Sequence, residues 1–234
     1  MIIPVALLFF ALPMLAGAFV RVVKPEARGL RVLLSFSGAF LLGIVFMHML
    51  PELYEEEGMG IGAWVLAGFL LQVVLEFFSH GIEHGHMHVH GHKGDGLPLL
   101  TLASLCIHSF TEGIPFADPE VAGNAPFLTG VVLHKMPMAI ALATVLQRAG
   151  SASAASWIML AVFAAAAPAG ILTGHLVGDL MDGHFLHRML GLAIGMLLHI
   201  STTIIFESAP EHRFNAVRFI AVIIGAVLAG LMNH

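Results

Sequence analysis

The sequence predicts an all-α fold: a polytopic membrane helix bundle with eight transmembrane helices. Hydrophobic residues make up 58% of the 234 residues and charged residues only 11%, whereas a soluble domain carries about 25% charged residues. The mean hydropathy is +0.92. The apolar residues gather into segments of roughly 20 residues, the length that crosses a bilayer. Lipid offers no partner to open backbone groups, so helices are the expected spanning elements.

Eight such segments follow one another, and residues 1–234 are therefore predicted to form one transmembrane domain. The first segment has neither a basic N-terminal region nor a small-residue cleavage site, so we interpret it as a retained helix and not as a signal peptide. The single cysteine, Cys106, excludes a disulfide framework and a cysteine metal cluster. The predicted spans are 3–23, 32–50, 60–80, 97–117, 124–147, 153–175, 185–206 and 214–232.

Charge predicts the orientation. Eight of the ten basic residues belong to the links after odd-numbered spans, so these links are predicted to be cytoplasmic and both termini outside. We expect an integral membrane protein, in a bacterial inner membrane. The opposite links are acidic; their carboxylates either concentrate cations at an entrance or form plain solvated loops. The acidic residues are Glu52, Glu55, Glu56, Glu57, Asp118, Glu120, Asp179 and Asp182.

The predicted cytoplasmic link at residues 81–96, between the third and fourth spans, is rich in histidine. Histidine alternates with glycine and other residues there, which is typical of a flexible tract with several imidazole ligands. We interpret it as a loop that holds or senses metal; the alternatives are a pH-sensitive spacer or a chance tract. Its histidines are His84, His86, His88, His90 and His92.

Ionisable residues at mid-membrane depth are the strongest functional signal. His108 and Glu112 are four residues apart and therefore share one helix face. Counted from Leu97 and from Asn124, His108 and His134 each lie about ten residues into a span, which is roughly 15 Å, or half of a ~30 Å hydrocarbon core. Imidazole and carboxylate together are ligands for zinc and similar divalent metals. The sequence thus predicts a metal site between the fourth and fifth spans.

Several neighbours could modify this site. Pro115 and Pro137 each remove a helical hydrogen bond, as in the broken helices around midplane sites of transporters. Met138 is either a soft fourth ligand or a packing residue. The ammonium of Lys135 is expected to pair with Glu112 or to repel a second cation. The alternative for Lys135 is that its stem reaches water and the residue has no role.

Further polar residues suggest a route through the membrane. His48 and Glu52 are candidates for an outer entrance. Glu76 and His80, again four residues apart, are candidates for an inner exit. His199 has no other histidine near it in the interior of the seventh span; it either has a functional role or forms a hydrogen bond between helices.

These residues resemble the ZIP (Zrt/Irt-like) family of divalent metal transporters over the whole chain. The resemblance implies that spans 1–3 and 6–8 are inverted repeats around spans 4 and 5, a 3+2+3 arrangement. It also implies alternating access, import into the cytoplasm and, often, a homodimer. The motifs are His108-Ser-Phe-Thr-Glu112-Gly113, His134-Lys-Met-Pro137, His48-Met-Leu-Pro51-Glu52 and, more weakly, Gly195 through Glu207.

The sequence departs from the family pattern at the positions of a second metal. Many members have Asn where this chain has Ser109, and an acidic residue where it has Met138. Lys135 stands where an acidic residue or Asn often follows the histidine, and Ala167 stands where a Glu can precede Pro-x-Gly. We therefore expect one central metal.

The predicted function is secondary transport of a divalent transition metal, most simply zinc, with Fe2+, Mn2+, Co2+ and Cd2+ as other substrates. We expect no resident cofactor, no nucleic-acid partner and, without a Walker motif, no direct use of ATP. Two alternatives remain: an exporter of the cation-diffusion type, and a zinc-dependent membrane hydrolase. The partners expected are the metal ion, membrane lipid and a second copy of the chain.

Overall fold

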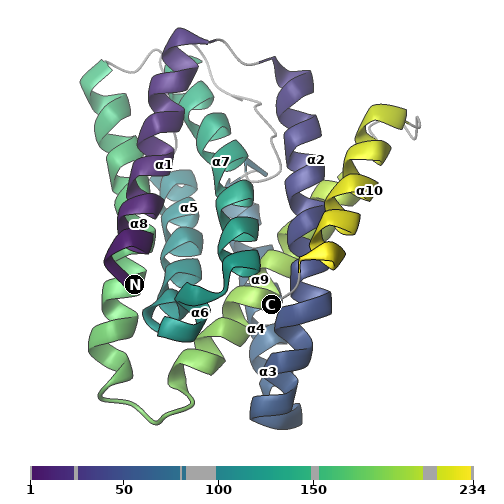
Figure 1. Cartoon of the computed structure of the whole chain (residues 1–234). Helices are drawn as coiled ribbons and strands as arrows, with labels where there is room; N and C mark the ends of the chain where they lie inside the picture. Colours follow the sequence, from purple (N-terminus) through teal and green to yellow (C-terminus); the bar gives the residue numbers. More distant parts are fainter. Residues whose placement is uncertain are drawn as a thin grey trace.

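The computed structural model describes residues 2–23, 26–79, 81–82, 99–148, 153–207 and 215–232. Within these ranges every regular element is a helix, which confirms the predicted all-α bundle (Figure 1). The long helices are α1 (Ile2–Val22), α2 (Ala27–Ile44), α4 (Gly62–Ser79), α5 (Leu99–Gly113), α7 (Ala125–Arg148), α8 (Ser153–Gly178), α9 (Phe185–Glu207) and α10 (Ala216–Leu231).

Six helical stretches in the described part of the chain are long and apolar enough to cross a membrane. One of them, Arg28–Ser79, runs for 52 residues and contains both the second and the third predicted spans, as α2 and α4. The last predicted span corresponds to α10, which is apolar but has only 16 residues. The number of eight spans therefore stays a prediction.

The chain reverses direction between α2 and α4. Gly58 has a φ of +68°, a conformation that glycine adopts without steric cost. A Cβ on Gly62 would lie 2.8 Å from the hydroxyl of Tyr54, so the two arms of this turn pack closely. The turn consists of a π-helical segment, a short helix and a 3-10 turn: η1 (Val45–Met49), α3 (Leu50–Glu57) and η2 (Gly58–Ile61).

One end of the bundle, which we call the acidic end, carries α3, the short helix α6 (Pro119–Gly123) and the link between α8 and α9 (Figure 1, lower end). The acidic residues named above belong to these segments or to the residues beside them. The opposite end carries the last turns of α1 and α7 and the first turns of α2 and α8 (Figure 1). Among the described residues, Arg21 and Arg28 lie at this opposite end, so charge is segregated between the two ends. A cytoplasmic position of the basic end stays a prediction.

Helices α5 and α7 lie in the middle of the bundle, with α1 and α8 on one side and α2 and α10 on the other (Figure 1). Helix α1 packs against α7 and α8 against α5, while α2 packs against α10 and α4 against α9. Helix α5 ends at Gly113, where the 3-10 turn η4 (Ile114–Ala117) begins with Pro115 in its first turn. Pro137 lies inside α7, which continues through it.

Glycine permits several of these helices to approach backbone to backbone. A Cβ built on Gly195 in α9 would stand only 1.9 Å from the carbonyl oxygen of Val65 in α4. Gly170 in α8 is as close to α5, with 2.0 Å to the carbonyl oxygen of Phe110. Small residues at such contacts are typical of membrane helix pairs. They hold α4, α5, α8 and α9 close together around the polar residues described next.

Candidate metal site

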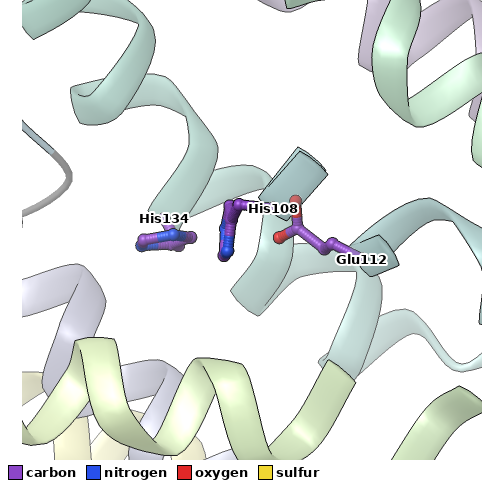
Figure 2. Close-up of side chains that lie close together, drawn as sticks. All are labelled: His108, Glu112 and His134. Atoms are coloured by element: carbon purple, nitrogen blue, oxygen red, sulfur yellow. The ribbon is translucent and has the colours of Figure 1, made fainter. Parts of the chain in front are cut away.

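His108, Glu112 and His134 meet in the interior of the bundle (Figure 2). The first two extend from α5 and the third from α7. One ligand atom from each residue lies within 4.8 Å of the others, and the three residues are 0%, 2% and 0% exposed. The juxtaposition predicted by counting residues from opposite membrane surfaces is therefore present. Two imidazoles and a carboxylate at this spacing can bind one divalent metal after small side-chain rotations.

His108 is oriented by a residue that the sequence analysis did not single out. Its Nδ1 lies 3.0 Å from the side-chain oxygen of Gln72 on α4, which is itself fully buried. When Nδ1 donates to this oxygen, Nε2 carries the lone pair that a metal requires. The helix-to-helix hydrogen bond and the ligand role are thus compatible. The missed signal is that Gln72 lies four residues before Glu76, on the same helix face.

Lys135 points into the same interior and pairs with Glu112. Its ammonium contacts Oε2 of Glu112 and donates to Oγ of Ser109 at 3.0 Å. Lys135 is 1% exposed, so the alternative that it reaches water is wrong. The other carboxylate oxygen, Oε1 of Glu112, has no hydrogen-bond partner among the described residues. A buried carboxylate oxygen of this kind needs a partner, and a metal would supply one.

Met138, the proposed soft ligand, is completely buried. It belongs to an apolar cluster that includes Leu105, Leu142 and Ile200. This packing explains its burial without a metal, so its role as a ligand stays a prediction.

Glu76, one of the two candidate exit residues, has a partner on another helix. Glu76 on α4 contacts Nε2 of His199 on α9, and the ring of Phe69 packs edge-on against the His199 imidazole. His199 therefore has two contacts on the neighbouring helix α4. His80, the expected partner of Glu76, lies outside the described residues, as do His84, His86, His88, His90 and His92.

The two candidate entrance residues have different surroundings. Nε2 of His48, in the π-helical segment, lies 3.2 Å from the carbonyl oxygen of Ala229 on α10. Glu52 instead lines a small cavity at the acidic end, together with residues of α6 and α9. π-helical segments often occur at functional positions. The structure thus brings Glu52, but not His48, to an open acidic surface.

The fold and this site define a class, a membrane helix bundle with a buried histidine and carboxylate group. A family model described as ZIP Zinc transporter matches residues 97–233. The chain therefore belongs to the ZIP zinc transporter family and is an integral membrane protein.

Curated relatives carry related names. Zinc transporter ZIP13 of Pongo abelii is 31% identical over 165 residues, which are 58% of this chain and 48% of the relative. The Zinc transporter ZIP13 homolog of Drosophila melanogaster is 41% identical over 64 residues, 24% of this chain and 18% of the relative. Zinc transporter SLC39A7 of Rattus norvegicus is 34% identical over 87 residues, 29% of this chain and 19% of the relative. The matched part of this chain thus spans about half the length of the first relative and about a fifth of the other two. All three relatives are named as zinc transporters.

Proposed function

We propose that this chain imports a divalent transition metal, zinc in the first place, into the cytoplasm. The observation that carries the proposal is the buried group of His108, Glu112 and His134, whose ligand atoms lie within 4.8 Å of one another. Burying a carboxylate and two imidazoles inside an apolar bundle is costly, so such a group is a functional hypothesis by default. Membership of the family supports zinc as the cargo.

The charges suggest a path. A cation collects at the acidic end, loses water as it binds the three ligands, and leaves towards the basic end past Glu76 and His199. With the basic end in the cytoplasm, the metal gradient drives uptake. The membrane potential adds to it, at about 2.3 kcal/mol per charge and 100 mV. The histidine-rich link at residues 81–96 would then receive or sense metal on the inner side.

We also propose the 3+2+3 inverted repeat. Exchanging α1 with α8, α2 with α9, α4 with α10 and α5 with α7 converts the α1–α7 contact into the α8–α5 contact. The same exchange converts the α2–α10 contact into the α9–α4 contact. Such a correspondence is expected for two halves related by a twofold axis in the membrane plane, the arrangement that permits alternating access by rocking.

The central site is proposed to hold one metal. The ammonium of Lys135 donates to Ser109, so two of the positions that depart from the family pattern contact each other. A positive charge here opposes a second cation, because two like charges about 4 Å apart repel by about 4 kcal/mol at an effective dielectric constant of 20.

Alanine substitution tests the ligands one at a time. We expect His108→Ala, Glu112→Ala and His134→Ala each to abolish zinc uptake into proteoliposomes while membrane expression is maintained. His175→Ala is the matched control, since His175 is an exposed histidine of α8. Near-normal transport by Glu112→Ala would overturn the site.

The same vesicles distinguish the competing classes. Metal loss from loaded vesicles in the physiological orientation would favour an exporter of the cation-diffusion type. Release of fatty acid or headgroup from the vesicle lipid, absent from Glu112→Ala, would favour a zinc-dependent hydrolase. Uptake without lipid cleavage is the expected result.

A further inference from the structure

We propose a second metal-binding site at the acidic end, with His187 and Glu56 as ligands and Glu57 as the residue that orients His187. The proposal rests on the transport function proposed above and assigns the site a role in capturing a divalent metal before it enters the membrane. His187 lies in the first turn of α9, and the two glutamates end α3. The three residues come from segments about 130 positions apart in the sequence.

The two nitrogens of the His187 ring face different carboxylates. Nδ1 lies 2.7 Å from Oε1 of Glu57, which is only 10% exposed. Nε2 lies 3.6 Å from Oε2 of Glu56. The first contact is a hydrogen bond, whereas the second is too long for one. His187 therefore donates through Nδ1 to Glu57, and in the neutral ring Nε2 carries the lone pair on the side that faces Glu56.

This is the arrangement in which a carboxylate orients a metal-binding histidine. With bonds of about 2.1 Å, two ligands of a tetrahedral zinc lie about 3.4 Å apart. The 3.6 Å separation between Nε2 and the Glu56 oxygen is close to that value. Glu57 is further held by His184, whose Nδ1 lies 2.8 and 3.0 Å from its two oxygens. The carboxylate that orients His187 is thus itself held in place.

A cavity of about 50 Å³ lies beside these residues. One water molecule needs roughly 10–15 Å³ of such space, so the cavity has room for a metal ion and for water. Glu52, one helical turn before Glu56, also lines it and adds negative charge beside the two ligands. No lysine or arginine is among the described residues that line it. The acidic residues of the lining are Glu52, Glu56, Asp118 and Glu120.

Asp118 has a structural role that limits its use as a ligand. Its Oδ1 accepts a hydrogen bond of 2.8 Å from the backbone N–H of Glu120 and so caps α6. The site is therefore built on His187 and Glu56. Imidazole plus carboxylates suits zinc and other borderline divalent metals.

The test measures equilibrium Zn2+ binding to the purified full chain in nanodiscs, with the central site disabled by His108→Ala and His134→Ala. The five histidines of the link, which would also bind zinc, are replaced by alanine: His84, His86, His88, His90 and His92. We expect one bound Zn2+ in this background, and its loss on adding His187→Ala. Glu57→Gln, which keeps both ligands, should weaken binding by about tenfold, as loss of an orienting residue does at other metal sites. Adding His175→Ala, at an exposed histidine near the end of α8, should leave binding unchanged.

Two outcomes overturn the proposal: no Zn2+ bound when the central site is disabled, or the same affinity with and without His187. Glu56→Gln, a conservative change at a 44% exposed side chain, serves if His187→Ala fails to fold, and it too must weaken binding. In a chain with an intact central site, His187→Ala should raise the KM for zinc uptake and leave the maximal rate unchanged. Transport that survives loss of the central ligands would refute the central site but not this one. Absence of zinc uptake by the unmodified chain would refute the proposed function, whereas zinc binding at this site would still be measurable.

Discussion

The buried pair of Lys135 and Glu112 yields the sharpest prediction about the central site. In Lys135→Met, a side chain of similar length fills the same space without its charge. Glu112 then loses the ammonium on Oε2, and both partners are almost completely buried, at 1% and 2% exposed. Removing one member of a buried ion pair costs roughly 3–5 kcal/mol, because the other charge stays buried without compensation. The empty protein should therefore be destabilised.

A metal ion restores the missing positive charge. By linkage, the free energy that the empty site loses reappears as tighter metal binding. Even half of that cost, about 2 kcal/mol, corresponds to a roughly thirtyfold lower Kd. Release to the cytoplasm should slow accordingly, so the variant is expected to bind zinc more tightly and transport it more slowly.

Competition with a fluorescent chelator measures the Kd on protein that lacks the other metal-binding groups, through His187→Ala and deletion of residues 84–92. Uptake into proteoliposomes measures the rate. The control is Lys135→Met combined with Glu112→Gln, in which no buried charge is left alone. This double variant should regain stability and bind zinc weakly. A Kd for Lys135→Met within threefold of that with lysine, or a weaker one, would show that the ammonium does not compete with the metal.

Three further predictions concern the central site, the histidine-rich link and the contact between α4 and α9. Lys135→Asp combined with Met138→Glu should admit a second central metal, counted by elemental analysis; two central metals in the unmodified chain would refute the mononuclear site. Deleting residues 84–92 should leave transport measurable and change its apparent affinity or regulation, whereas complete loss in a folded protein would make the loop part of the path. Gly195→Ala should lower thermal stability by about 1–3 kcal/mol, because its Cβ would stand 1.9 Å from a backbone oxygen of α4. Gly29→Ala, with nothing within 4 Å, should be neutral or slightly stabilising in the same melting assay.

The central site could be predicted because its information is local. His108 and Glu112 share a helix face by their spacing, and their depth follows from counting along one helix. The depth of His134 is counted in the same way from the other surface. The pairing of Lys135 with Glu112 followed because a buried ammonium needs an anion, and this carboxylate was the candidate at that level.

Contacts between other helices could not be predicted in this way. Each of these contacts joins side chains from two helices, and the sequence does not specify how the two helices are rotated relative to each other. The contacts are Gln72 with His108, Glu76 with His199, and Glu57 with His187. In a membrane an apolar helix face can contact either lipid or another helix, so hydrophobic periodicity does not predict which faces pack together. The expected pairing of Glu76 with His80 considered only neighbours on one helix and overlooked His199.

The sequence by itself determined the helical class, the separation of charge between the two ends, and the meeting of His108, Glu112 and His134. Each depends on composition or on spacing along one helix. Because the thickness of the bilayer is known, a position along a spanning helix gives the depth of the residue in the membrane. Only the tertiary structure decided which helices touch, that Gln72 orients His108, and that His187 lies between two glutamates of α3. These contacts depend on close packing at glycines such as Gly195 and on the turn at Gly58. Both set distances between segments that are remote in the chain, which spacing within one helix cannot specify.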